Sequence, residues 1–530
     1  MCQLNSSYDI VHKIGGANGL SADLHEFLIT PEDTVLMTIY EIVPGDVSMF
    51  RDFNPETNKH DNEANYIWDG IAQEIDIATG ELIFEWRASE HVDVTETYRP
   101  IYGMGNKNDP FDWYHINSIQ KDKLGNYLVS ARYTHSLMYI DGKTKETIWQ
   151  LGGQKNDFLD LSEGMGINFA WQHDARFQPL DAFPESYTPP MHREGYTTKL
   201  VTLFDNAAED QHYDYGLEYS RGLVLELTYP TPGVDRFIDD ETTTTTDLAA
   251  RTLRKRSWDQ YKIDTTNGTD AAYTVRVIKS YENPQGTRSS SQGNIQLLPQ
   301  GPGKDPKVFV GYGLAAVYTE FAPNGSVLCD AHYGPRMSWD SGHIQSYRDY
   351  KFAWTGRPKW TPKVVLSDDD LIVYVSWLGA TDIEEWTLQS SRSGSAKDAE
   401  WKDLLRVPKI SFETAIVVPR PEDGGSPDRY LRVVAPTTDG AELPNGRSPV
   451  LDRGIINAYF PSVSKQLPRK VASLTPAKAF FIILCCAATL VVVYELYRRW
   501  RSGRGGRPGV GGAVRWRKGV FPGGILGSEA

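Results

Sequence analysis

Three histidines and one arginine occur in predicted strands at positions that could build a catalytic site. His25, His115 and His173 each open a short strand, and Arg132 lies on the strand that follows His115. A guanidinium offers a planar fork of N–H donors to the oxygens of an anion, and a neutral imidazole offers a nucleophilic nitrogen. The set therefore suits the binding of a divalent or tetrahedral oxyanion.

Other interpretations of these residues are open. A single histidine at the start of a strand is more often a structural hydrogen-bonding residue than a catalyst. Three histidines could also hold zinc, although the usual short-spaced pair with a carboxylate is absent. We interpret the remaining polar and aromatic neighbours as ring-orienting residues (Asp112, Asn117, Asp174, Asn206), core (Tyr133, Trp171) or surface (His91, His135, His343).

The elements that must position this set belong to a repeating unit. Four times the chain shows a short strand opening with His or Gln, a turn, a more apolar strand and two further strands. The anchors of these units are His25, His115, His173 and Gln292. Four-stranded units that repeat in this way are typical of propeller blades, whose innermost strands line one axis. The anchors should therefore converge, which the competing β-sandwich would not explain.

Composition supports an all-β protein. The chain is 12% aromatic and contains 46 glycines and 31 prolines, with few long helical periods. Its formal net charge of −14 argues against nucleic acid as a partner. We predict a β-propeller domain over residues 1–360, a fibronectin type III-like β-sandwich over 361–462 and a linker over 463–478.

The end of the chain carries a membrane signal. Residues 479–497, "AFFIILCCAATLVVVYELY", approach the roughly 20 apolar residues that span a bilayer. The basic tail at 498–530 then marks the cytosolic side, which predicts a single-pass membrane protein with an extracellular or lumenal propeller. Sequons at Asn5, Asn267 and Asn324 fit that orientation. The first residues contain no apolar signal-peptide core, and Cys2 and Cys329 permit at most one disulfide outside the membrane segment.

Several ordered motifs together resemble one family. "SADLHEFLIT", "HINSIQKDKLGNYLVSAR", "FAWQHDARF", "SQGNIQLLP" and "YRDYKFAWTGRP" are similar to those of the fungal arylsulfotransferase-like proteins, relatives of the bacterial arylsulfate sulfotransferases. The resemblance covers roughly residues 8–460. It implies a six-bladed propeller, of which about four complete blades are visible, and therefore an N-terminally truncated chain.

The resemblance also implies an activity. The bacterial enzymes move a sulfuryl group between phenols without PAPS, through a sulfohistidine. Matched by motif, "QHDA" makes His173 the nucleophile, and His25, His115 and Arg132 its partners. The implied substrates are a small aryl sulfate donor and a phenolic acceptor, with no cofactor and no metal. The alternative is a non-catalytic membrane-anchored ectodomain that binds a ligand or a cell-wall component.

Overall fold

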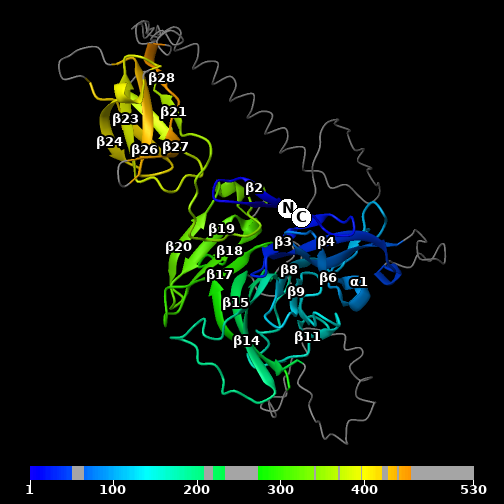
Figure 1. The fold of residues 1–530 in the computed structure, drawn as a ribbon. Helices are drawn as coiled ribbons and strands as arrows, with labels where there is room; N and C mark the ends of the chain where they lie inside the picture. The colour runs from blue at the N-terminus through cyan, green and yellow to red at the C-terminus, as the bar shows by residue number, and fades with distance from the viewer. Residues whose placement is uncertain are drawn as a thin grey trace, which may run out of the picture. The chain divides into compact units, whose positions relative to one another are not determined.

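The computed structural model describes residues 1–50, 65–207, 219–232, 272–339, 342–367, 371–395, 397–420, 428–437 and 441–454 (Figure 1). In these residues the protein is almost entirely β. Its helical segments are single turns: α1 (Ala88–His91), η1 (Ser48–Phe50), η2 (Val94–Glu96), η6 (Gly313–Ala315), η7 (Arg336–Ser338) and η8 (Asp398–Glu400).

The chain divides into two compact units. The first comprises Met1–Pro362, Trp377–Glu384 and Ala435–Arg447. The second comprises the described residues of Lys363–Ser376, Glu385–Val434 and Ser448–Ala530.

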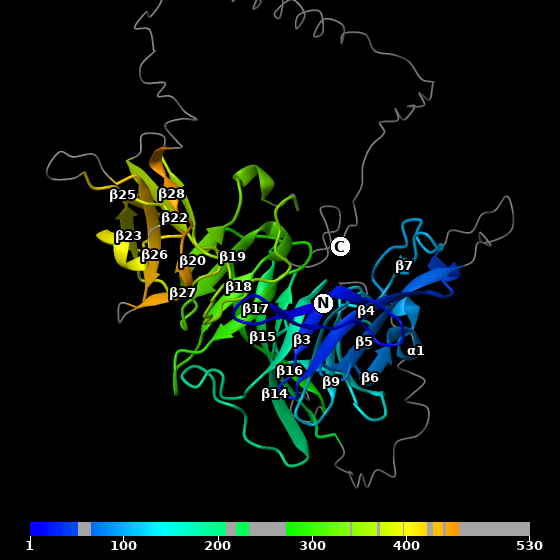
Figure 2. The ribbon, with the colours of Figure 1, turned by 45° about the horizontal axis from the view of Figure 1, so that its top comes forward.

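The first unit contains four successive antiparallel sheets, each with the up-and-down topology of a propeller blade (Figures 1 and 2). Sheet 1 consists of β3 (Ala22–Ile29), β4 (Thr34–Pro44), β5 (Tyr66–Asp76) and β6 (Leu82–Arg87), with β7 (Phe111–Asp112) added parallel to β5. Sheet 2 consists of β8 (Ile116–Lys121), β9 (Tyr127–Ala131), β10 (Ser136–Ile140) and β11 (Thr147–Gly152).

The other two sheets follow the same plan. Sheet 3 consists of β13 (His173–Gln178), β14 (Tyr196–Asp205), β15 (Arg221–Pro230) and β16 (Thr274–Glu282), with β12 (Leu159–Asp160) parallel to β16. Sheet 4 consists of β17 (Asn294–Leu298), β18 (Lys307–Gly311), β19 (Val317–Phe321) and β20 (Val327–His332). A hairpin of β1 (Cys2–Leu4) and β2 (Ile10–Lys13) precedes them.

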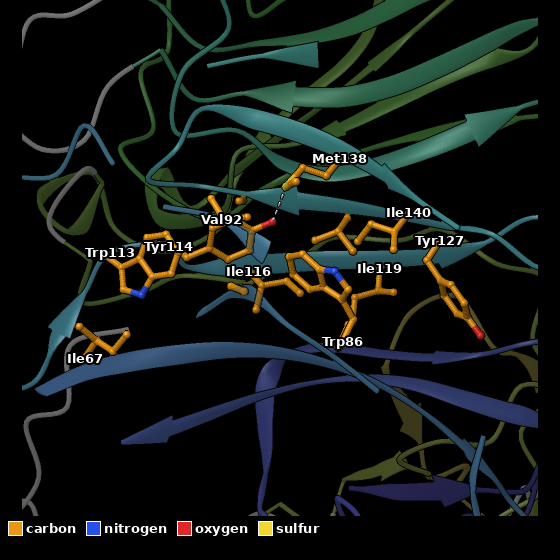
Figure 3. Close-up of a cluster of buried hydrophobic side chains, with 14 of the residues drawn as sticks. Ile67, Trp86, Val92, Trp113, Tyr114, Ile116, Ile119, Tyr127, Met138 and Ile140 are labelled. Carbon is orange, nitrogen blue, oxygen red and sulfur yellow. Dashed lines mark hydrogen bonds between the residues drawn. The ribbon is translucent and has the colours of Figure 1, made fainter. Parts of the chain in front are cut away.

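Apolar packing between neighbouring sheets holds the unit together. Strands β9 and β10 are buried at every residue, because both faces of sheet 2 are covered. Between sheets 1 and 2, Trp86, Tyr114, Ile119 and Met138 belong to one buried cluster, in which the Tyr114 hydroxyl lies 3.1 Å from the sulfur of Met138 (Figure 3). Burial of side chains this large is the main favourable term that fixes adjacent sheets against each other.

The inner strands share a local irregularity. β3, β8 and β13 contact one another in turn, and β17 contacts β13. The pairing register shifts between Ala22 and Phe27 in β3, between Ile116 and Ser118 in β8, and between His173 and Arg176 in β13. Bulges of this kind re-aim side chains. Each one lies at or beside a predicted anchor histidine.

The second unit is built around two further antiparallel sheets. One contains β21 (Lys363–Leu366), β22 (Ile372–Ser376) and β25 (Glu413–Val417). The other contains β24 (Lys402–Pro408), β23 (Glu385–Ser391) and most of β26 (Tyr430–Pro436), with β28 (Leu451–Asp452) pairing β26. The remaining strand, β27 (Glu442–Arg447), falls in the first unit. Val373, Trp386 and Val433 are among its buried residues.

The described residues contain no helix that is long and apolar enough to cross a membrane. The predicted span at 479–497 and the basic tail lie outside the described residues, and the anchor stays a prediction. Cys2 and Cys329 are both exposed and free, so they do not form the disulfide that the sequence permitted.

Candidate active site

Two of the predicted histidines are in contact. The rings of His25, on β3, and His115, directly before β8, lie 4.7 Å apart between centroids and nearly perpendicular. Tyr40 on β4 packs against both rings, at 5.6 Å and 5.7 Å. Both histidines are buried. The bulges in β3 and β8 therefore bring side chains from two sheets to one place.

Each of these two imidazoles is paired with an aspartate. Nδ1 of His25 bonds to Asp23, and Nδ1 of His115 bonds to Asp112. Within the described residues, neither Nε2 makes a hydrogen bond. Burial, opposed by Asp112, lowers the pKa of His115 to about 4. An Asp-paired imidazole whose second nitrogen is free has the form of a general acid or base.

His173 has a different environment, which contains no carboxylate partner. Its Nδ1 lies 2.7 Å from Oδ1 of Asn206, whose Nδ2 donates to the carbonyl oxygens of Ser289 and Gln292 at 3.0 Å and 2.9 Å. These two carbonyls fix the orientation of the amide, so Oδ1 must accept and Nδ1 of His173 must carry the proton. Nε2 then holds a lone pair, which accepts from the backbone N–H of Gln292 at 3.2 Å.

The charge state of His173 follows from the same surroundings. Burial, together with the nearby charge of Arg132, holds the pKa of His173 well below its usual value. The ring is therefore neutral at physiological pH. A neutral imidazole with a fixed tautomer is a nucleophile once its Nε2 lone pair is released from the Gln292 N–H.

Arg132 is a buried cation without a carboxylate. Its Nη1 donates to the Tyr133 hydroxyl at 2.7 Å, its Nη2 donates to the Ser290 carbonyl at 2.9 Å, and its Nε has no partner. Across the described part of the chain it makes no ion pair. The buried Arg221, by contrast, pairs with Asp205 at 3.0 Å. Because an unpaired buried charge is costly, Arg132 is suited to receive an anion.

The backbone around the site is strained. His115, His135, Trp171, Asp174 and Gln292 all have positive φ values, between 50° and 65°. Such values are uncommon for residues with a Cβ and tend to occur at functional sites. The neighbouring Gly293 has a φ of 100°, and a Cβ there would lie 2.5 Å from Phe204. Only glycine therefore lets this loop bring the Gln292 amide to His173.

A buried cluster of charges lies next to the histidines. Arg348 donates to Glu26 at 2.9 Å and to the Asn117 carbonyl at 2.7 Å, and Arg176 binds Glu26 at 2.6 Å and Asp174 at 2.8 Å. We call Glu26, Asp174, Arg176 and Arg348 the central charge cluster. Two carboxylates and two guanidinium groups balance each other there, which makes their burial tolerable.

The central charge cluster holds the inner strands in place. Glu26 directly follows His25, Asp174 directly follows His173, and Arg348 comes from the chain after sheet 4. That segment is bound to β17, because Asn294 donates to the Asp349 carbonyl at 2.7 Å and accepts from its N–H at 2.8 Å. The cluster therefore joins sheets 1 to 4 at the level of the imidazoles.

The sequence-based prediction was wrong about His135 and did not identify several residues that surround the imidazoles. His135, interpreted as a surface residue, is buried, and its ring stacks on Tyr98 at 4.3 Å and meets Trp171 edge-on at 4.3 Å. Asp23, Glu26, Tyr347 and Arg348 were not singled out, although the last two lie within the motif "YRDYK". Distance along the chain hid Tyr347 and Arg348, whereas Asp23 and Glu26 flank His25 and their place in "SADLHEF" was the available signal.

We expect the free energy of unfolding to decrease as the pH decreases, in part because of His135. Burial, with a contribution from Arg132, lowers the pKa of His135 to about 3, whereas an unfolded histidine titrates near 6.5. Since the folded pKa is the lower one, the stabilisation is fully present above pH 6.5 and is lost as the pH falls toward 3. Lowering the pH from 6.5 to 5 should therefore decrease the free energy of unfolding by about 1.5 kcal/mol through this residue.

Urea unfolding at the two pH values tests this expectation. His135→Phe should lose about 1.5 kcal/mol less than the wild type over that interval. His12→Gln, which changes an exposed histidine, should lose as much as the wild type does. An unchanged pH dependence in His135→Phe would contradict the prediction.

All four predicted residues thus lie around one region. His25 contacts His115, and Tyr133 packs on His115 at 4.7 Å and accepts a hydrogen bond from Arg132. The loop before β17 touches both Arg132 and His173, through Ser290 and Gln292. In the described residues no group of three or more His, Cys, Asp or Glu side chains could hold a metal ion. The arrangement can bind an anion and offer it a neutral nucleophile.

Comparison with known proteins gives a family. The family model described as arylsulfotransferase (ASST) matches residues 1–334. A search of curated proteins gives no match.

Solved structures show only distant similarity. A protein of unknown function from Bacteroides caccae is 11% identical, with 73% of this chain and 91% of that chain covered and a TM-score of 0.20. The β-propeller domain of Cps50 (Swd1) from Myceliophteria thermophila is 8% identical, with 72% and 81% covered and a TM-score of 0.18. Hsv2 from Kluyveromyces lactis is 8% identical, with 73% and 99% covered and a TM-score of 0.19.

Proposed function

The chain belongs to the arylsulfotransferase family, and from this premise we propose that it moves a sulfuryl group from an aryl sulfate to a phenolic acceptor through an intermediate on His173. One observation carries the proposal. Arg132 is buried beside a neutral His173 and has no carboxylate partner among the described residues. An anionic sulfuryl group supplies the missing charge and meets the nucleophile at the same place.

The first half-reaction follows from the protonation states. The Nε2 lone pair of His173 gives up its hydrogen bond from the Gln292 N–H and forms a bond to sulfur, while the bond from sulfur to the aryl oxygen breaks. The leaving phenolate takes a proton from the Asp-paired ring of His25, because the lowered pKa of His115 leaves that ring neutral. Arg132 stabilises the charge on the sulfuryl oxygens during the transfer.

The second half-reaction reverses these roles. The acceptor phenol gives its proton to the same Asp-paired imidazole, and its oxygen attacks sulfur. The bond between sulfur and Nε2 breaks, and the electron pair returns to His173. Atoms and charges balance over the cycle without a nucleotide.

The test is to trap the intermediate. The protein is mixed with 4-nitrophenyl sulfate in the absence of an acceptor, and released 4-nitrophenol is followed in time. We expect a burst equal to the protein concentration, with one sulfuryl group on the peptide that contains His173. Absence of both the burst and the modified peptide would reject the transfer reaction and favour a non-catalytic binding protein.

A further inference from the structure

A third aromatic residue packs against the imidazoles and comes from outside the four sheets. The ring of Tyr347 lies 5.3 Å from that of His25 and 6.2 Å from that of His173, edge-on to both. It therefore touches the proposed nucleophile and one of the two Asp-paired imidazoles. Within the described residues, no other aromatic ring packs against both His25 and His173.

The backbone holds Tyr347 firmly in this place. Its carbonyl accepts from the N–H of Gly293 at 3.0 Å, next to the Gln292 amide that binds His173. The preceding N–H, of Ser346, donates to Gly313 at 3.3 Å, and the following Arg348 enters the central charge cluster. Interactions on both sides of the residue thus orient the ring.

Among the tyrosines that surround the imidazoles, Tyr347 differs in the hydrogen bonding of its hydroxyl group. Three tyrosines contact the rings of His25, His115 or His173. The Tyr40 hydroxyl donates to the Ile116 carbonyl at 2.6 Å, and the Tyr133 hydroxyl accepts from Arg132 at 2.7 Å. The Tyr347 hydroxyl is buried and has no hydrogen-bond partner among the described residues. A buried hydroxyl left unpaired costs free energy, so its presence beside the nucleophile calls for a ligand atom.

We propose that the Tyr347 hydroxyl donates a hydrogen bond to an equatorial oxygen of the sulfuryl group, an inference that rests on the proposed function. In an in-line transfer, sulfur moves along the line from the leaving oxygen to the nucleophile, and its three other oxygens point sideways from that line. Tyr347 flanks the rings that would stand at the two ends. In this proposal, its hydroxyl meets the side of the reacting group.

The protonation state of Tyr347 fits this role. Burial, as the largest effect, raises the pKa of its hydroxyl above the usual value. The group therefore stays a neutral donor at physiological pH. A neutral donor to an anionic oxygen forms a charge-assisted hydrogen bond.

The test compares Tyr347→Phe with Tyr350→Phe. The second variant removes a hydroxyl of the same segment that donates to Asp174 at 3.2 Å in the central charge cluster. The probe is 4-toluenesulfonate, which presents three sulfonate oxygens and cannot transfer its group. Its dissociation constant should rise about tenfold in Tyr347→Phe, the scale of one hydrogen bond to a charged group, and stay unchanged in Tyr350→Phe.

Turnover provides the second measurement. In Tyr347→Phe, kcat/KM should fall about tenfold to a hundredfold, by the same factor for 4-nitrophenyl sulfate and for phenyl sulfate. A loss that grows with the pKa of the leaving phenol would overturn the assignment, because the hydroxyl would then act on the leaving oxygen. Equal losses in the two tyrosine variants, or unchanged sulfonate binding in Tyr347→Phe, would overturn it as well.

The two proposals can fail separately. Sulfonate binding needs no transfer, so weaker binding in Tyr347→Phe would stand even if no sulfuryl group were found on His173. A trapped intermediate with unchanged sulfonate binding in Tyr347→Phe would reject the role of Tyr347 and leave the transfer reaction intact.

Discussion

His173→Ala should reduce sulfuryl transfer to the background rate, a loss on the order of a thousandfold or more. In the proposed reaction, the substitution removes the Nε2 lone pair that attacks sulfur. His25 and His115 are held by aspartates through Nδ1, and in that reaction His25 acts on the leaving oxygen. The initial rate of 4-nitrophenol release, with a phenol acceptor present, measures the effect.

Two controls separate loss of the nucleophile from loss of structure. His173→Ala leaves Asn206 Oδ1 without its partner, which should cost about 1–3 kcal/mol, so its unfolding must be measured alongside. His343→Ala changes an exposed histidine and should keep full activity. Transfer at the wild-type rate by folded His173→Ala protein would refute the assignment of the nucleophile.

Arg132→Met should lower kcat/KM by about a hundredfold to a thousandfold while destabilising the protein far less than loss of a paired buried arginine does. In the proposed reaction, the guanidinium is the charge that meets the sulfuryl oxygens, and methionine fills its volume without that charge. Because Arg132 has no carboxylate partner among the described residues, its loss strands no opposite charge. Removing a buried charge of this kind is neutral or stabilising.

Arg221→Met is the matched variant. Arg221 is equally buried but pairs with Asp205 at 3.0 Å, so its loss should cost about 3–5 kcal/mol of unfolding free energy. Urea unfolding and transfer assays on both variants give the comparison. If Arg132→Met destabilises the protein as much as Arg221→Met does, Arg132 is a structural cation and its role in binding the anion fails.

The repeating pattern of the chain predicts much of the architecture. Alternating apolar residues and turns are local signals, and they indicate four successive four-stranded units, which are sheets 1 to 4. The same pattern places His25, His115 and His173 at equivalent points of their units. Burial is harder to derive locally. His135 carries no motif, and only the packing of Tyr98 and Trp171 against its ring makes it a buried residue.

By itself the sequence determined the all-β class, the repeat and the residue types of the site, because these depend on composition and short-range periodicity. Only the tertiary structure decided which side chain or backbone group bonds to each imidazole. Asp23 and Asp112 are near neighbours of their histidines, but Asn206 and Gln292 reach His173 from other parts of the chain. Tyr347 and Arg348 likewise enter the site from beyond sheet 4. Such contacts depend on bulges and strand packing between distant segments, which leave no periodic trace in the sequence.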